Sequence, residues 1–371
     1  MILTIILFLV VLAVLIFVHE LGHFLVAKLC GVRVDEFCVG FPPRIFSVKK
    51  GETKYSIGAI PFGGFVKIFG EDGDEEPANQ VSGQSEAPVD FSRSFTSVSK
   101  WKQATILLSG IFFNLLFAWI LISSSFAMGM ISSIDTGSKN IATNVSTIVL
   151  SVAKGSPAEK VGIILGDRIL TISNGSESFN TPSMTEVQKV VKEATSSVSI
   201  VYTRNGVQKI ATTTPVLSNG IQIIGISMDT VGTIKFGFFR SFYEGGKETI
   251  LTSGKVIVGI YDLIKNSILG KADFSQVAGP VGIAGMVNQA RFFGLSYFLG
   301  FIALISINLG MINLVPFPAL DGGRVLFVAI EAIIKKDIKP IIANILNTVG
   351  FALLILLMVV LTFKDISRLI K

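Results

Sequence analysis

Four long apolar stretches constrain the fold of this chain more than any other feature. They are Ile2–Leu29, Ala104–Ile131, Tyr297–Val315 and Ile341–Phe363, and each is long enough to cross a bilayer as a helix, which takes about 20 residues. Half of the 371 residues are hydrophobic and only 16% are charged, a balance typical of an integral membrane protein. The first stretch lacks a basic n-region and a cleavage site of small residues, so we expect a retained span rather than a cleaved signal peptide.

The first stretch ends in an H-E-x-x-H motif at residues 19–23. On a helix, His19 and His23 lie four residues apart and project from one face, so both imidazoles can bind one metal ion. Glu20 lies beside them and is not positioned as a third ligand, but it can take a proton from a metal-bound water. Two imidazoles and a carboxylate are a common catalytic zinc set, which makes Zn²⁺ the expected cofactor.

The alternative is that these side chains form a polar patch that only holds helices together. The chain contains two histidines, and both belong to this motif. An ionisable side chain near the bilayer centre costs about 2.5–3.5 kcal/mol, so such residues usually have a function. We therefore favour a metal site of the kind that zinc hydrolases use.

A zinc site of this kind needs a third protein ligand, and the third apolar stretch suggests where it lies. This stretch runs into Pro316 and Pro318, which cannot continue a regular helix. Irregular backbone at membrane depth occurs only where it is buried in protein or lines a wet cavity. Asp321 follows the break directly, and we choose it as the carboxylate ligand. The alternative is that Asp321 caps a helix at Val325–Ile334, and the two roles could coexist.

Basic residues predict the orientation of the chain in the membrane. None precedes the first stretch, and two groups follow the first and third stretches. The groups are Lys28, Arg33, Arg44, Lys49, Lys50 and Lys54, and Arg324, Lys335, Lys336 and Lys339. The positive-inside rule places both groups in the cytoplasm and the N-terminus outside, although the basic residues near the C-terminus would then lie outside too. At about 1.5 Å per helical residue, His19 and Asp321 both fall near the cytoplasmic edge of a core about 30 Å thick.

Charge and cysteine content argue against other classes. The net charge of +6 is modest and spread out, and no basic tract with interleaved aromatics indicates nucleic-acid binding. This charge suits the surface of an anionic lipid bilayer instead. The spacing of the two cysteines, Cys30 and Cys38, is not a zinc-binding pattern, and a disulfide framework needs more cysteines than two. We therefore expect free thiols.

The spans divide the chain into four regions. Residues 1–131 hold the first two spans, a β-hairpin and a loop, and residues 135–232 are polar and long enough for one soluble domain. Residues 238–296 contain a stretch, Phe238–Leu269, whose apolar spacing predicts an amphipathic helix on the outer membrane face or against the spans. Residues 297–371 hold the last two spans. In the polar domain we expect strands at Ile148–Val152, Arg168–Ile172, Val198–Thr203 and Val207–Thr212, and a helix at Thr185–Ala194.

Between the first two spans, Tyr55–Gly70 predicts two short strands around Pro61-Phe62-Gly63-Gly64. A hairpin this apolar, close to the motif helix, would dip into the membrane or cover the site. The alternative is an ordinary hairpin in the core. The acidic run Glu71–Glu76 that follows carries no predicted chemistry.

Three asparagines in the spans have open roles. Asn308 and Asn313 are five residues apart, so they do not share a face of an ideal helix. An amide there could donate to the oxyanion of a tetrahedral intermediate or hold an unwound substrate, and the alternative is hydrogen bonding between helices. We expect Asn114 in the second span to have this structural role.

These motifs together resemble those of the site-2 protease family of intramembrane zinc metalloproteases. The segments that carry the resemblance are H-E-L-G-H, the hairpin G-x-x-x-x-G-G-F-V, and N-L-x-P-x-P-x-L-D-G-G after the third span. Gly155–Gly162 and Leu165–Leu170 are similar to the PDZ domain that bacterial members carry between the second and third spans. This chain has one such segment where some relatives have two, and it reads Ser109-Gly110-Ile111 where many members read A-G-P.

The resemblance implies roles for the residues chosen above. His19, His23 and Asp321 would be the zinc ligands, Glu20 the general base, and Asn308 and Asn313 would engage the substrate. Members of the family cut single-span membrane proteins, such as anti-sigma factors or remnant signal peptides, after another protease has removed the outer part. The expected location is the cytoplasmic membrane of a bacterium, with the PDZ-like domain outside and the active site near the cytoplasmic side.

We thus expect a polytopic α-helical membrane protein with about four transmembrane helices, a membrane-associated β-hairpin and one inserted α/β PDZ-like domain. A substrate helix must unwind before its peptide bonds can react, and we expect it to pair with the strand around Gly63, Gly64 and Phe65 by strand addition. The outer domain would exclude substrates with bulky external parts. The rival classes are a PDZ scaffold with structural zinc and, less well supported because no internal repeat of spans is evident, a transporter.

Overall fold

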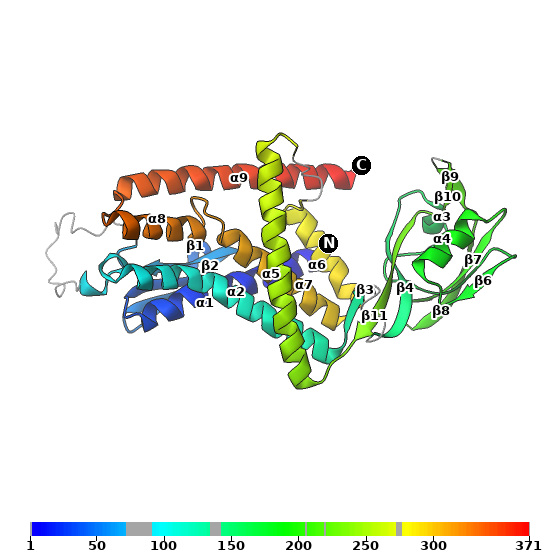
Figure 1. The fold of residues 1–371 in the computed structure, drawn as a ribbon, viewed down its shortest axis with the longest axis horizontal. Helices are drawn as coiled ribbons and strands as arrows, with labels where there is room; N and C mark the ends of the chain where they lie inside the picture. The colour runs from blue at the N-terminus through cyan, green and yellow to red at the C-terminus, as the bar shows by residue number, and fades with distance from the viewer. Residues whose placement is uncertain are drawn as a thin grey trace. The chain divides into compact units, whose positions relative to one another are not determined.

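The computed structural model describes residues 2–71, 91–133, 142–204, 206–218, 220–271 and 277–370. The chain forms two compact units, shown as ribbons in Figure 1. One unit contains Met1–Ser123, Phe242–Ala290 and Phe298–Lys371, and the other contains Ser124–Ser241 and Arg291–Tyr297. We call them the helical unit and the β unit.

Four helices of the described chain are long and apolar enough to cross a membrane, which confirms the four predicted spans. They are α1 (Ile2–Leu29), α2 (Lys100–Met128), α7 (Leu295–Asn313) and α9 (Pro340–Ile370). The second span ends before Ile131 because Gly129, with φ +103°, leads the chain out of the helix and into a strand. The apolar composition of these segments therefore determines where the helices form.

Close contact between α1 and α2 places the H-E-x-x-H motif in the interior of the helical unit. A Cβ atom on Gly22 would lie 2.6 Å from the carbonyl oxygen of Ser109, and a Cβ on Gly110 would meet the rings of both motif histidines. Small residues allow this approach, as in other membrane helix pairs. The N-terminal part of α1 packs through Val11 and Leu15 against α7 and the short helix α6 (Pro280–Ala290).

Two antiparallel strands, β1 (Val34–Lys50) and β2 (Thr53–Ile68), follow α1. The turn between them contains Glu52, whose carboxylate accepts hydrogen bonds from Arg93 and from Lys28 at the end of α1. These two cations hold the pKa of Glu52 at about 2, well below its usual value. The turn is therefore fixed to the end of α1 and to the segment that leads into α2.

The pairing within β1 and β2 differs from the hairpin predicted at Tyr55–Gly70. Residues 53–58 and 64–68 do not pair with each other but lie on opposite sides of residues 34–39. Residues 44–50 pair with the outer side of 53–58, so the four segments form a small antiparallel sheet with 64–68 at one edge. Extended strand is present on both sides of residues 61–64, as predicted, but the pairing of these two strands with each other is wrong. The tight turn lies earlier, at residues 51–52, and the glycine pair bends the strand.

Two further helices complete the helical unit. Asp321–Ile334 forms α8, and a single helix, α5 (Phe238–Ile268), occupies the segment with the amphipathic pattern. Figure 1 shows α5 running across the direction of α2 and α9. The first turns of α5 are attached to α2, where Trp119 of α2 donates through Nε1 to the carbonyl of Phe242 in α5 at 2.8 Å. Many apolar side chains of α5 are exposed, including Ile250 and Ile268.

The β unit contains an antiparallel main sheet, a separate pair of antiparallel strands and two short helices. The order of its main sheet is β3, β11, β4, β5, β7, β8, with β6 paired to β5, and β9 and β10 form a separate pair. Its core consists of apolar residues such as Ile169, Ile172 and Val187. The strands are β3 (Met130–Ser133), β4 (Thr143–Val152), β5 (Arg168–Ser173), β6 (Ser178–Asn180), β7 (Val198–Arg204), β8 (Val207–Thr213), β9 (Val216–Ser218), β10 (Ile221–Ile223) and β11 (Ile226–Ile234), and the helices are α3 (Pro157–Lys160) and α4 (Met184–Lys192).

The G-D-R segment of the β unit contains a buried ion pair. Asp167 is completely buried and accepts hydrogen bonds from the guanidinium of Arg204 at 2.7 Å and from the backbone N–H of Ile164 at 2.9 Å. These contacts attach the loop before β5 to the end of β7. The motif thus has a structural role in the described residues.

The close contact of α1 and α2 predicts a strong effect of Gly22→Ala. The added methyl would press against the Ser109 carbonyl, so we expect the free energy of unfolding to fall by about 1–3 kcal/mol. The matched control is Gly254→Ala on α5, where an added Cβ meets no atom within 4 Å; alanine there should be neutral or slightly stabilising. Thermal unfolding in detergent measures both, and equal midpoints for the two variants would contradict this contact.

Candidate metal centre

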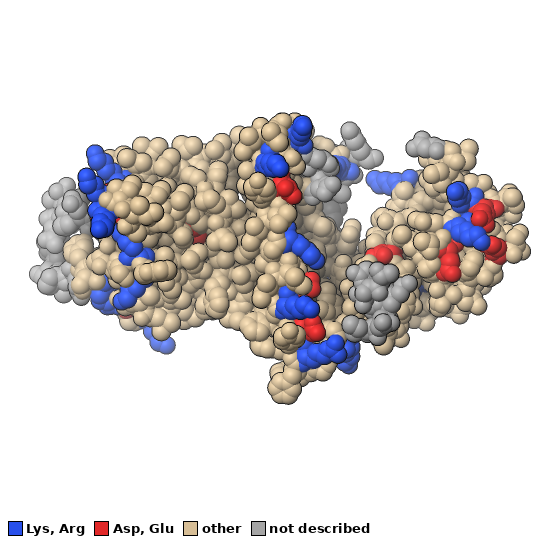
Figure 2. Space-filling view, viewed as in Figure 1, with Lys and Arg blue, Asp and Glu red and all other residues tan. Residues whose placement is uncertain are grey.

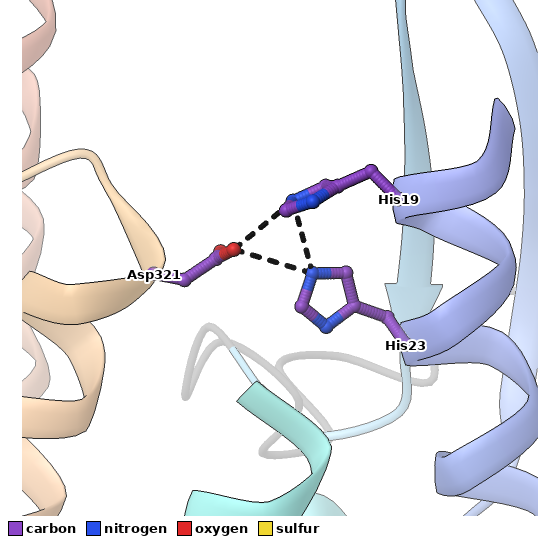
Figure 3. Close-up of side chains that lie close together, drawn as sticks. All are labelled: His19, His23 and Asp321. Atoms are coloured by element: carbon purple, nitrogen blue, oxygen red, sulfur yellow. Dashed lines mark hydrogen bonds and ion pairs between the residues drawn. The ribbon is translucent and has the colours of Figure 1, made fainter. Parts of the chain in front are cut away.

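Three potential metal ligands from distant parts of the chain converge in the helical unit (Figure 3). The Oδ2 atom of Asp321 lies 3.0 Å from Nε2 of His19 and 3.3 Å from Nε2 of His23, and the two Nε2 atoms lie 3.3 Å apart. The two histidines are buried and Asp321 is half-buried. The structure thus brings together the three residues that the sequence singled out.

The size of this triangle suits zinc. Bonds of about 2.0–2.1 Å place the ligands of a tetrahedral zinc ion about 3.3–3.4 Å apart, close to the three distances here. The Oδ2 atom of Asp321 is buried and makes no hydrogen bond of good geometry within the described chain. Three atoms that carry lone pairs therefore face one point, which a cation would stabilise.

The backbone between α7 and α8 explains how Asp321 reaches the histidines. α7 ends at Asn313, and the segment with the two prolines leads to Leu320, which is the N-cap of α8 and has extended φ and ψ. Asp321 is therefore the first helical residue and does not cap the helix, so the N-cap alternative is wrong. Glycines at 322 and 323 let this first turn press against the carbonyls of Leu314 and Phe317.

Glu20 lies in the same site without joining the three ligands. It lines a cavity of about 170 Å³ together with His19, His23 and Asp321. Its carboxylate accepts a hydrogen bond from the backbone N–H of Val66 in β2. An acid–base group is thus held beside the candidate ligands by the edge of the small sheet.

The edge segment 64–68 of β2 forms one wall of this cavity. Phe65 and Val66 line it, and the backbone of Gly64 lies so close to α1 that a Cβ would be 3.3 Å from Cγ of Glu20. Gly63 does not line the cavity, and its φ of +129° is one that other residues rarely adopt. Two of the three hairpin residues chosen from the sequence therefore lie at the site, and the third shapes the strand.

The two asparagines of α7 are not part of the cavity wall among the described residues. Asn308 donates through Nδ2 to the carbonyl of Leu304 in its own helix at 2.8 Å. Asn313 is the last residue of α7 and is half-buried. Neither lies among the residues that line the cavity. The structure does not bring them to the metal centre in this state.

An ion pair at the cavity was not predicted from the sequence. The Arg324 guanidinium lies 2.5 Å from a carboxylate oxygen of Glu71, just after β2, and both residues line the metal cavity. Arg324 also lines two adjoining cavities of about 340 and 370 Å³. The spacing of three residues from Asp321 on α8 could have placed Arg324 near the site, but it gives no indication of Glu71 as its partner. The rest of the acidic run Glu71–Glu76 lies outside the described residues.

The contacts of the two imidazoles were only partly foreseen. Nδ1 of His23 lies 2.9 Å from the carbonyl oxygen of Ile106, and Nδ1 of His19 lies 3.0 Å from Nδ2 of Asn114. Both partners belong to α2. Asn114 bonds to the neighbouring helix α1, as expected, and its partner there is a candidate metal ligand.

Membrane-spanning helices and a histidine–carboxylate cluster of this geometry define a class, the membrane zinc metalloproteases. Comparison with known proteins gives the family. The profile described as "Peptidase family M50" matches residues 7–357, and the chain belongs to this family, the site-2 proteases. The predicted family, the protease activity and the dependence on zinc are thereby confirmed.

Curated relatives of similar length carry matching names. A "Putative zinc metalloprotease" of Clostridium perfringens is 34% identical over 354 residues, which cover 95% of each chain. A protein of the same name from Helicobacter pylori is 32% identical and covers 97% of this chain and 98% of its own. The "Zinc metalloprotease RasP" of Oceanobacillus iheyensis is 30% identical over an alignment of 440 positions, which covers 99% of each chain. The similarity thus extends over the whole sequence.

Proposed function

We propose that this protease hydrolyses peptide bonds in or near the transmembrane segment of single-span membrane proteins, after another protease has cut them outside the membrane. The observation that carries this proposal is the metal cavity itself, which lies between a membrane-spanning helix, α1, and the edge of a β-sheet. Anti-sigma factors and remnant signal peptides are substrates of the expected class.

The roles of the residues follow from the geometry. His19, His23 and Asp321 would hold Zn²⁺ through the three atoms that face one point. The chemistry that zinc supplies when bound is a polarised scissile carbonyl and a water whose pKa is lowered to about 7. Glu20, beside the ligands in the same cavity, takes the proton of the attacking water and passes it to the leaving amine.

The substrate would bind as an added strand. A helix that unwinds in the membrane exposes backbone groups that need partners, and the edge segment 64–68 of the small sheet lines the cavity through Phe65, Val66 and Ile68. Gly64 and Phe65 would lie against the substrate, while Gly63 shapes the strand. Asn308 and Asn313 engage the substrate only if the helices rearrange on binding.

The β unit would act as a size filter outside the membrane. A PDZ-like identity is supported by its sheet, its two short helices and a groove of about 430 Å³ between α4 and residues 221–228. PDZ domains accept extended peptides in such grooves. Figure 2 shows Lys and Arg gathered at the end of the helical unit where α8 meets α9, which supports a cytoplasmic location for that end in a bacterial cytoplasmic membrane.

Glu20→Gln tests the acid–base role. The amide cannot take a proton, so cleavage of a single-span substrate should fall by at least about 100-fold, while the zinc content, measured by mass spectrometry of the purified protein, stays unchanged. The matched control is Glu193→Gln at the exposed end of α4, which should cleave normally. Normal cleavage by Glu20→Gln would refute the role, and a zinc-loaded wild-type protein that cleaves no single-span substrate would favour the scaffold alternative.

Strand addition predicts a periodic effect of backbone methylation in the substrate. Alternate residues of an added strand direct their N–H groups toward the partner strand. In a series of synthetic transmembrane peptides with one N-methylated residue each, cleavage should therefore fall at every second position near the cut. Uniform sensitivity, or none, would contradict strand pairing. The protein is unchanged throughout, whereas a proline at Gly63 would disturb the strand itself because of the positive φ.

Removal of most of the β unit tests the filter. Ser133 of β3 and Val231 of β11 are paired, so replacing residues 134–230 with Asn-Gly closes a two-residue hairpin and keeps the ends together. We expect this variant to bind zinc and to cleave full-length and trimmed substrates at similar rates, whereas the complete protein should prefer the trimmed one. An unchanged preference would mean that substrate size is selected elsewhere.

A further inference from the structure

We propose that α2 sets the tautomers of both motif histidines, and that Asn114 is the positioning residue for His19. The inference rests on the proposed ligand set and goes beyond it by assigning residues that act through the ligands. The residues of α2 that face the two histidines have the same spacing as the histidines. Ile106, Gly110 and Asn114 follow one another on α2 at intervals of four residues. They lie against His19 and His23 of α1, which are also four residues apart.

The partner of His23 admits only one tautomer. A backbone carbonyl can only accept hydrogen bonds, so Nδ1 of His23 must carry the proton that it shares with the carbonyl oxygen of Ile106 at 2.9 Å. Nε2 is then the nitrogen with a free lone pair, and it is the one that faces Asp321 at 3.3 Å. The backbone of α2 therefore prepares His23 to bind a metal through Nε2.

His19 requires the same tautomer, and its partner is an amide. Its Nε2 lies 3.0 Å from the carboxylate of Asp321, so a neutral imidazole that binds metal there must carry its proton on Nδ1. Asn114 is completely buried, with Nδ2 3.0 Å from that Nδ1 atom. Its Oδ1 atom is buried with no hydrogen-bond partner in the described chain.

Rotation of the Asn114 amide by half a turn would give its Oδ1 atom a hydrogen-bond partner on His19. With Nδ2 toward His19, the amide donates to an unprotonated Nδ1, and a neutral imidazole would then carry its proton on Nε2, toward Asp321, which suits the protein without metal. Exchange of the two terminal atoms places Oδ1 at Nδ1, where it accepts the proton of the metal-binding tautomer. Asparagine can serve both states because it carries a donor and an acceptor. Leucine offers neither group, and aspartate offers the acceptor alone.

Gly110 makes these contacts possible. A Cβ at this position would meet Nε2 of His23 and lie 2.7 Å from Cε1 of His19. The absence of a side chain lets α2 approach until its carbonyl and its amide reach the two rings. Hydrogen bonds to the ring nitrogens that do not bind the metal orient ligating imidazoles, and their loss typically weakens metal binding 10- to 100-fold.

The test compares Asn114→Leu with Asn114→Asp in the full-length protein. Zinc affinity is measured by competition with a chelator, and the two imidazoles are observed by ¹⁵N NMR after histidine labelling, which yields only two rings because the chain has two histidines. We expect Asn114→Leu to raise the Kd for zinc about 10- to 100-fold and to change the tautomer signals of His19 but not those of His23. Asn114→Asp, which keeps the acceptor, should bind zinc more tightly than Asn114→Leu. The matched control, Asn344→Leu in α9, should leave both readouts unchanged.

The outcomes separate this inference from the proposed function. If zinc leaves both histidine rings of the wild-type protein unaffected, the proposed ligand set itself fails. If zinc shifts both rings in the wild type, but Asn114→Leu binds it with wild-type affinity and shows the same His19 tautomer, the positioning role is refuted. Should Asn114→Leu not fold, Asn114→Ala takes its place against Asn114→Asp, with equal zinc affinity of the two as the refuting result.

Discussion

The convergence of two imidazole nitrogens and one carboxylate oxygen within 3.3 Å is the interaction on which the rest of the helical unit depends. Such groups are costly among apolar helices, where little water is present to solvate them. A bound cation replaces that solvation, and its binding free energy contributes to folding because the ligand set does not exist in the unfolded chain. Since His19 and Asp321 lie far apart in the sequence, a metal ion held by both would also tie α1 to α8.

A protease inside a bilayer must solve a second problem, the exposed backbone of its unwound substrate. Each unpaired N–H or C=O group in hydrocarbon costs several kcal/mol. The edge segment 64–68 lies directly beside the cavity and would offer partners for such groups if the substrate adds to it as a strand. The same edge holds Glu20 through the N–H of Val66. A substrate strand that pairs there would compete for or adjust this contact, so substrate binding and the placement of the proton acceptor are physically coupled.

Sequence reasoning succeeded where the signal is local. Composition located the spans, and the four-residue spacing placed His19 and His23 on one face. The proline break pointed to Asp321, although excluding its capping role required the backbone conformation of Leu320. Reasoning failed where the outcome depends on distant contacts. The sheet register depends on the turn that Lys28 and Arg93 hold through Glu52, and no periodic pattern encodes that.

The same limit applies to polar pairs inside the helical unit. Arg324 and Glu71 are far apart in sequence, so their ion pair at the cavity could not be inferred from either neighbourhood. Asn114 was recognisable as a hydrogen-bonding residue in a span, but its partner depends on how α2 is rotated against α1. Two glycines allow that rotation, because a Cβ at Gly22 would meet the Ser109 carbonyl and a Cβ at Gly110 would meet the rings of both motif histidines. Packing and chemistry therefore share one interface, and a side chain that improved the helix contact at position 110 would displace both candidate ligands.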